Sequence, residues 1–258
     1  KHAITRGVSP EKLRMILEDL GPTYIKLGQI MSLRSDILPK RYCDELMKLC
    51  SDVAPMPFDQ VVDVIQDAFG CPWQEEFQSI EEKPLGSASI AQVHRAVLKS
   101  GEQVVIKVQR KGIYRTMARD IGLMHKVVRL LPPVSTKEMV DLDLVLDELW
   151  KVTQEEMNFL TEAANIEEFH RKNRDVAFVD TPVLYREYTT PHVIVMEYID
   201  GFSIDDKENL QKNGYDLNEV GSKHIDNFIK QVMVDGFFHA DPHPGNLRVR
   251  DGKIVWID

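Results

Sequence analysis

The chain has 258 residues, of which 43% are hydrophobic and 28% are charged, and its net charge is −9. This apolar fraction is ample for a buried core, and the acidic balance argues against a nucleic-acid-binding protein, whose binding face must be basic. No apolar run approaches the roughly 20 residues that cross a bilayer. The three cysteines, Cys43, Cys50 and Cys71, predict reduced and packed thiols rather than a disulfide framework.

The first quarter of the chain has the pattern of a helical bundle. Ser9 followed by Pro10 predicts a helix start, because serine caps helices and proline favours their first position. Gly21 predicts the end of that helix. Apolar spacing and flanking Pro and Gly residues predict three further helices, over 22–35, 39–50 and 57–69.

The pattern changes near Phe77, where strands are expected. Residues 89–97 alternate with period two, and 104–108 read as a buried strand after a turn. The elements expected after these are helices over 113–131, 137–172 and 217–235, and strands over 183–185 and 193–196. A helical block, a small sheet and a mostly helical remainder predict an α+β fold rather than alternating βαβ units.

The last twenty residues carry the order of groups that kinase-type sites use. His239 is followed by Asp241 and then Asn246, residues 249–254 have the pattern of a hairpin, and an apolar strand ends at Asp258. In such sites the first Asp faces the acceptor hydroxyl, and the Asn and second Asp hold Mg²⁺ on the nucleotide phosphates. The sequence therefore predicts Asp241 as the catalytic residue, with Asn246 and Asp258 as the metal ligands.

Two earlier stretches fit the nucleotide side of such a site. Residues 86–93 have the spacing of a kinase glycine loop, although alanine stands at two glycine positions. Lys107 ends an apolar strand, and its ammonium group needs a polar partner such as phosphate or the carboxylate of Glu162. The candidate nucleotide-binding residues of the loop are Gly86, Ser87, Ala88, Ser89 and Val93.

A third stretch, residues 195–201, has the form of an interlobe hinge. An apolar strand passes there into an acidic and aromatic linker, and the backbone of Glu197 and Ile199 is expected to bond adenine. The order of these groups along the chain is the one that a nucleotide-dependent phosphotransfer site requires: a small-residue loop, a strand lysine, a helix glutamate, a hinge, then an Asp and an Asn.

With these motifs, the chain resembles the UbiB-type atypical protein-kinase-like family over nearly its whole length. The most specific match is Lys26-Leu27-Gly28-Gln29, which is similar to the family's K-x-G-Q signature, and residues 84–94 resemble its alanine-rich loop. The resemblance implies a protein-kinase-like fold with a helical N-terminal extension and a truncated C-lobe. It also implies that Lys26, Gln29 and Glu156 belong to a regulatory lid over the mouth of the site, which hinders protein substrates.

The same resemblance implies the site roles and the function. Lys107 becomes the nucleotide lysine with Glu162 as its partner, and the cofactors become ATP and Mg²⁺. The expected function is an atypical kinase or ATPase serving isoprenoid quinone or lipid metabolism, located at the cytoplasmic face, with membrane association left open. The expected domains are 1–75 as the helical extension, 76–200 as the N-lobe and 201–258 as the C-lobe.

Two residues depart from the family pattern. Gly86 stands where alanine is usual, and Asn158 replaces the second acid of the E-x-D motif, so Glu156 must carry any ion pair alone. Two other functions stay open. One is a non-catalytic ATP-sensing scaffold that binds an isoprenoid or a partner protein. The other is a small-molecule phosphotransferase of the aminoglycoside or choline kinase type, although such enzymes lack the Lys26 signature.

Overall fold

The structure is a computed structural model that describes residues 8–36, 38–49, 54–130 and 142–257. The chain forms two compact units. The first unit comprises residues 1–73, 81–94 and 107–158, and the second comprises 74–80, 95–106 and 159–258. The chain passes from one unit to the other several times.

The first unit begins with the expected helical bundle. Helix α1 (Pro10–Leu20) is capped by the Ser9 side chain, which accepts a hydrogen bond of 3.2 Å from the Lys12 N–H. Gly21, at φ +99°, then turns the chain into the next helix. The remaining helices are α2 (Pro22–Ser32), α3 (Lys40–Leu46) and α4 (Phe58–Phe69). The third is shorter than predicted, since it ends at Leu46, and Cys50 lies outside the described residues.

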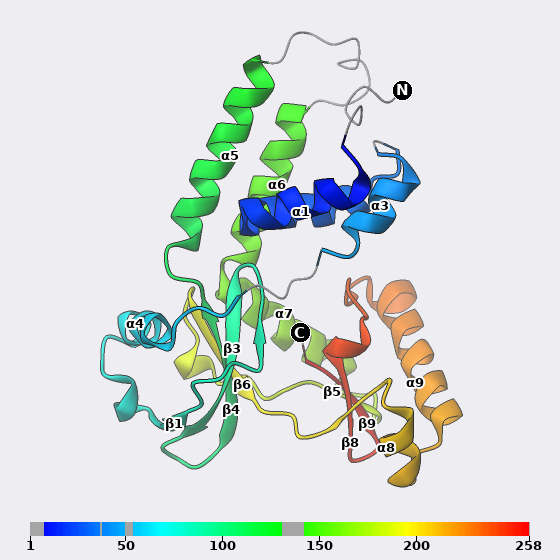
Figure 1. The fold of residues 1–258 in the computed structure, drawn as a ribbon. Coiled ribbons are helices and arrows are strands. Elements are labelled where there is room, and N and C mark those ends of the chain that lie inside the picture. Colours follow the sequence, from blue (N-terminus) through cyan, green and yellow to red (C-terminus); the bar gives the residue numbers. More distant parts are fainter. Residues whose placement is uncertain (1–7, 37, 50–53, 131–141, 258) are drawn as a thin grey trace. The chain divides into compact units, whose positions relative to one another are not determined.

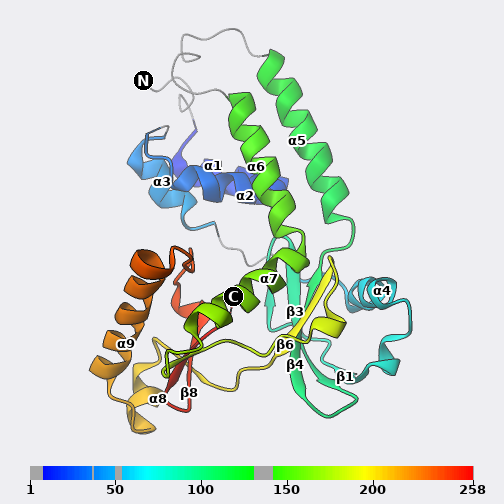
Figure 2. The same ribbon diagram turned by 180° about the vertical axis from the view of Figure 1, so that it is seen from behind.

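An apolar cluster holds α1, α2 and α3 together. Its buried members are Ile25, Leu38, Tyr42, Cys43, Leu46 and Leu49. Helices α5 (Ile113–Leu130) and α6 (Leu142–Glu156) lie side by side in the same unit, as Figures 1 and 2 show. Leu27 and Ile30 of α2 pack on a second cluster, formed by Ile121, Leu146 and Leu149. The signature helix α2 therefore has both of its faces occupied.

The single helix predicted over 137–172 is wrong, because the chain breaks after α6 and restarts as α7 (Phe159–Asn173). The Met157 carbonyl, which a continuous helix would use, accepts a hydrogen bond of 2.7 Å from Gln109 Nε2. The Phe159 N–H instead donates to the Pro191 carbonyl at 3.1 Å. Tertiary hydrogen bonds thus satisfy backbone groups that would otherwise continue the helix.

The main sheet has five strands, with β1, β3, β4 and β6 in that order and β2 paired to β3. Their bounds are β1 (Phe77–Ile80), β2 (Gly86–Ser87), β3 (Ala91–Leu98), β4 (Gln103–Gln109) and β6 (Val193–Glu197). The strand predicted over 183–185 is wrong. The segment reaches β6 through one isolated bridge between Leu184 and Met196, formed by hydrogen bonds from the Tyr185 N–H to the Val195 carbonyl and from the Glu197 N–H to the Val183 carbonyl.

The second unit holds a smaller sheet, in the order β5, β9, β8 and β7. Strands β8 (Leu247–Arg250) and β9 (Lys253–Trp256) form the expected hairpin, turning through Asp251 and Gly252, which both have positive φ. Figure 1 shows α9 (Leu217–Lys230) alongside this sheet. The sequence reading missed three short elements, which are β5 (Val179–Asp180), β7 (Phe202–Ser203) and α8 (Lys207–Lys212).

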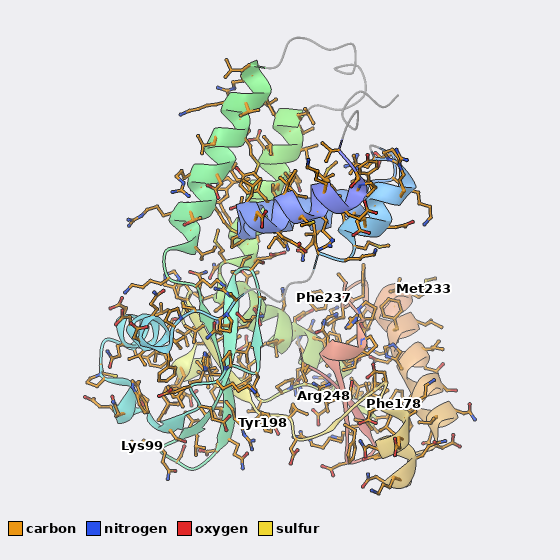
Figure 3. The ribbon with its side chains drawn as sticks, viewed as in Figure 1. Lys99, Phe178, Tyr198, Met233, Phe237 and Arg248 are labelled. Carbon is orange, nitrogen blue, oxygen red and sulfur yellow. The ribbon has the colours of Figure 1, made fainter. Side chains whose placement is uncertain are left out.

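Helix α9 does not end in a simple cap. It continues as a π-helical turn over Gln231–Asp235, a form often found at functional sites. Met233 in this turn is 77% exposed, whereas Phe237 just beyond it packs on the core of the second unit (Figure 3).

The mixture of helices and sheet confirms the α+β class. No helix within the described residues is long and apolar enough to cross a membrane.

Candidate active site

The loop predicted to bind phosphate is the turn between β2 and β3. Gly86 pairs with Val93, and Ser87 pairs with Gln92. The Ala88 N–H donates to the Ala91 carbonyl at 2.8 Å, which closes the turn. Among the described non-glycine residues only Asp251 has a positive φ, so the loop conformation at Ala88 does not require glycine. A Cβ at Gly86 would meet no atom within 4 Å, so the alanine usual in the family would fit there.

Arg110, which the sequence reading missed, holds this loop in place through hydrogen bonds. Its Nε donates to the Ala88 carbonyl at 2.8 Å, and its Nη2 donates to the Ser87 hydroxyl at 2.7 Å and the Ala54 carbonyl at 2.9 Å. The Arg110 backbone N–H also donates to the Ile90 carbonyl at 2.8 Å. Burial lowers the pKa of this guanidinium. The loop is therefore held by a fork of hydrogen bonds that lysine could not reproduce.

A second brace runs through Gln92, which is 1% exposed. Its Oε1 accepts from the Met56 N–H at 2.7 Å, and its Nε2 donates to His94 Nε2 at 2.8 Å. His94 Nδ1 lies 2.7 Å from the Glu81 carbonyl, which can only accept. These partners fix a neutral imidazole with its proton on Nδ1. Burial lowers the pKa of His94, in keeping with that neutral form.

The two residues of the predicted nucleotide ion pair lie on different elements. Lys107 is a half-buried residue of β4 in the first unit, three positions before Arg110. Glu162 is in the first turn of α7, in the second unit. Their pairing stays a prediction, whereas the loop, its brace and Lys107 belong to one unit.

The predicted hinge begins where β6 ends. The Glu197 N–H donates to the Val183 carbonyl at 2.8 Å, and the Tyr198 N–H donates to the Gln103 carbonyl at 3.0 Å. The Glu197 carboxylate accepts from Arg250 Nη1 at 2.5 Å, and this bond raises the pKa of Arg250. The side chain of Glu197 is thereby anchored, and adenine binding by the backbone of Glu197 and Ile199 stays a prediction.

The proposed catalytic loop is organised by local hydrogen bonds in the second unit. Asn246 Nδ2 donates to the Asp241 carbonyl at 3.1 Å and lies 3.4 Å from its Oδ2. The Asp241 N–H donates to His239 Nδ1 at 3.2 Å, and the Gly245 N–H donates to His243 Nδ1 at 3.0 Å. Both histidines thus shape the loop, and the structure brings Asp241 and Asn246 together.

The second predicted metal ligand, Asp258, lies outside the described residues. Within the described part of the chain, no group of three or more His, Cys, Asp or Glu residues is arranged to hold a metal ion. Asn246 fits a Mg²⁺ ligand, because its Nδ2 is turned to Asp241 and its Oδ1 is the atom that can coordinate.

Three buried amides that the sequence reading missed lie behind the catalytic loop. The His239 N–H donates to Gln231 Oε1 at 3.0 Å, and Gln231 Nε2 donates to Asn227 Oδ1 at 2.6 Å. Asn227 Nδ2 donates to Asn173 Oδ1 at 2.7 Å. The pattern of apolar and polar residues along α7, α9 and the π-helical turn gave no sign that these amides point inward.

The residues of the predicted lid meet on α2. Lys26 forms an ion pair of 2.5 Å with Glu156 of α6, and Gln29 Nε2 donates to the Leu49 carbonyl at 3.3 Å. Gly28 lies between them at a close helix contact, because a Cβ there would lie 2.3 Å from a Leu49 methyl and 2.9 Å from a Leu17 methyl. A different contact in the fold therefore accounts for each of the three fixed positions of the K-x-G-Q signature, Lys26, Gly28 and Gln29.

Comparisons with known proteins identify the family of this chain. The family described as the ABC1 atypical kinase-like domain matches residues 48–258. A probable protein kinase UbiB of Marinobacter nauticus is 36% identical over 99% of this chain and 47% of its own length. The Arabidopsis thaliana chloroplastic protein Activity of bc1 complex kinase 8 is 36% identical over 100% of this chain and 35% of its own length.

A Clostridium pasteurianum protein, named only as an uncharacterized protein in the hydrogenase 1 5′ region, is 43% identical over 97% of this chain and 47% of its own length. The solved Mycobacterium tuberculosis Rv3197–erythromycin complex has a TM-score of 0.64 and 28% identity, covering 94% of this chain and 61% of that one. The chain thus spans about half the length of several curated relatives, or less. On the match over 48–258 and these relatives, the chain belongs to the ABC1 atypical kinase-like family, whose members include proteins named UbiB.

Proposed function

We propose that this chain is the nucleotide-binding part of a Mg-ATP-dependent atypical kinase or ATPase. The observation that carries the proposal is the hydrogen-bonded pair of Asp241 and Asn246 in one shaped loop. In kinase-type sites these two residue types serve the acceptor and the metal, in this order and spacing. Membership of the ABC1 family supports the kinase-like class. The binding of ATP and Mg²⁺ is proposed in addition to that class.

Each residue has a defined task in this proposal. Lys107 holds the phosphates, and the braced loop of residues 86–91 covers them with backbone groups. Asp241 orients the acceptor hydroxyl or water and accepts its proton. Asn246 and Asp258 would hold Mg²⁺, and the ion would supply positive charge to neutralise the phosphates.

The test is nucleotide binding and hydrolysis by the full-length protein. Asp241→Asn should remove turnover and leave Mg-ATP affinity within about twofold, because its task is at the acceptor. Asn246→Ala should instead weaken the Mg²⁺ dependence of binding. Equal loss of binding in both variants would show that the roles are wrongly divided. A wild-type protein that binds ATP without turnover would favour the ATP-sensing scaffold, which remains the second candidate.

Small-molecule phosphotransfer of the aminoglycoside or choline kinase type is less well supported. The contacts of Lys26, Gly28 and Gln29 account for a signature that those enzymes lack. The proposed acceptor or partner is an isoprenoid or quinone-precursor lipid, and this step rests on the resemblance of that signature. Adding such precursors and liposomes to the hydrolysis assay tests it directly.

One surface of the first unit supports a membrane-facing site of action for the full-length protein. On α5, Leu123, Val127 and Leu130 are 47%, 58% and 84% exposed. Arg119 and Lys126 are exposed on the same side of the helix, one or two turns away. Exposed apolar side chains beside cationic ones are typical of a helix that lies on an anionic lipid surface.

Vesicle binding tests the membrane part of the proposal. The full-length protein should bind vesicles containing phosphatidylserine more tightly than phosphatidylcholine vesicles, and Leu123→Glu should weaken this binding. Leu144→Glu is a matched control, since Leu144 is 65% exposed on α6. Equal effects of the two substitutions would argue against α5 as the lipid-facing surface.

A further inference from the structure

The three buried amides behind the catalytic loop form one continuous chain of hydrogen bonds. Asn173, Asn227 and Gln231 are 4%, 1% and 0% exposed. This hydrogen-bond chain starts at the His239 N–H and passes through Gln231, Asn227 and Asn173. It ends where Asn173 Nδ2 donates to the Phe169 carbonyl at 3.0 Å. It therefore connects the first residue of the loop to the last turn of α7.

The direction of this chain is fixed by its two ends. The His239 N–H can only donate, and the Phe169 carbonyl can only accept. Each amide between them must therefore accept through its oxygen on the loop side and donate through its nitrogen on the α7 side. No rotation of a single amide by 180° keeps both of its neighbours satisfied.

A chain of this kind couples the positions of its ends. Leaving a buried amide without a partner is costly, so the three residues are satisfied together or not at all. Asp241 lies two residues beyond His239 and donates its own N–H to His239 Nδ1. A shift of the His239 backbone therefore moves Asp241 directly.

The other end of the chain is on a helix that the proposed site also uses. Helix α7 carries Glu162 in its first turn and Asn173 in its last. Lys230 strengthens the same junction, because its Nζ donates to the Lys172 carbonyl at 2.9 Å and pairs with Asp235 at 2.7 Å. Helix α7 and the catalytic loop are thus tied through the end of α9.

We propose that Gln231 is a positioning residue for the catalytic loop, and that its amide chain to Asn173 makes the placement of Asp241 follow that of α7. Gln231 touches no reacting group, so its effect passes through the His239 backbone. The inference deepens the proposed phosphotransfer function, because it takes Asp241 as the acceptor-facing residue.

The first measurement needs no nucleotide. Gln231→Glu keeps the shape of the side chain, but an ionised carboxylate cannot donate to Asn227 Oδ1. Burial favours the neutral carboxyl group, whose folded-state pKa is then raised above the unfolded value. The substituted protein should melt near the wild-type temperature at low pH and lose stability as pH rises through the raised value. Gln211→Glu, at an exposed position on α8, should show no such added dependence.

Hydrogen exchange then locates the effect. In Gln231→Leu and in ionised Gln231→Glu, the amides of 237–243 and of 169–174 should exchange faster together, and Gln211→Glu should leave both unchanged. In turnover assays on the full-length protein, Gln231→Leu should lower kcat by roughly tenfold to a hundredfold, with ATP affinity within about twofold.

The outcomes separate the two proposals. If the wild-type protein hydrolyses no ATP, the proposed function fails, and melting and exchange still decide the amide chain. If Gln231→Glu follows the wild type at every pH and exchange of 237–243 is unchanged, the inference is overturned. It is also overturned if kcat and ATP affinity fall by the same factor, because that pattern indicates general loss of structure.

Discussion

Lys26 and Glu156 are 130 positions apart in the sequence and form an ion pair of 2.5 Å between α2 and α6. Their side chains are 19% and 39% exposed, so solvent screens much of the attraction. A buried hydrogen bond of 2.9 Å from the Thr23 hydroxyl to Asp120 joins the same helix to α5. Two polar contacts therefore anchor α2 to the helices packed behind it.

The first prediction concerns the second position of the E-x-D motif. Asn158→Asp adds a carboxylate two residues after Glu156, and we expect a gain of about 0.5 kcal/mol if it reaches Lys26. The gain should raise the melting temperature of the wild type and vanish in Lys26→Ala, as measured in a double-mutant cycle. An equal shift in both backgrounds would show that residue 158 does not couple to Lys26.

The second prediction concerns the nucleotide lysine. Lys107→Met should abolish productive nucleotide binding, because it removes the cation expected to hold the phosphates. If Glu162 is its partner, stranding that carboxylate should also cost up to about 3 kcal/mol of unfolding free energy. Lys99→Met, at an exposed position just after β3, serves as the control in calorimetry. Unchanged affinity and melting in Lys107→Met would refute the assignment.

The third prediction concerns the loop itself. Ala88 lacks a positive φ and its N–H is already bonded to the Ala91 carbonyl, so glycine there would loosen the turn. Ala88→Gly should raise ATP affinity relative to AMP if the freed backbone can approach the phosphates. It should also destabilise the protein by up to ~1 kcal/mol. Titrations with both nucleotides decide it, and parallel changes would mean that the loop binds no phosphate.

The fourth prediction concerns Arg110. Arg110→Lys keeps the charge but loses the fork that joins Ala88, Ser87 and Ala54, so ATP affinity should fall by roughly tenfold while AMP affinity changes little. Arg119→Lys is the matched control, because its side chain is 70% exposed and bonds only its neighbour Asp120 in the contacts described for it. If the two substitutions behave alike, Arg110 has no special relation to the loop.

The fifth prediction concerns pH. The folded-state pKa of His94 is lowered by burial, whereas the unfolded value is about 6.5. Below pH 6.5 the unfolded chain binds the extra proton more readily, so stability should fall as pH drops, by up to about 1.4 kcal/mol per unit. His94→Gln should weaken this dependence in melting curves from pH 7.5 to 5. His192→Gln, at an exposed site, should retain it.

Local sequence signals predicted the bundle and the hairpin well. Ser9, Gly21 and Gly70 act within a few residues of the ends they mark, so propensity and capping suffice. The break at Met157 was missed because it depends on Gln109 and Pro191, which are distant in sequence. Such contacts override the helical periodicity that continues through the break.

The residues of the candidate site also fall into two groups: those that local sequence signals predict, and those that depend on contacts distant in sequence. Asp241 and Asn246 could be predicted because proline and glycine around them exclude regular structure. Arg110 could not, because an arginine after a strand is usually solvated, and nothing local indicates that it turns under the loop. The inward amides of α9 were hidden for a similar reason, since Asn and Gln are ordinary on the polar face of a helix.

The π-helical turn at Gln231–Asp235 makes the site sensitive to length as well as to composition. Such a turn holds one more residue than an α-helical turn, and this extra residue sets the rotation of everything that follows it. Deleting Met233, whose side chain is largely exposed, would remove almost no packing. It would nevertheless rotate the backbone by about a quarter turn and carry His239 away from Gln231. In this segment an insertion or deletion at the surface is therefore more damaging than many substitutions in the core.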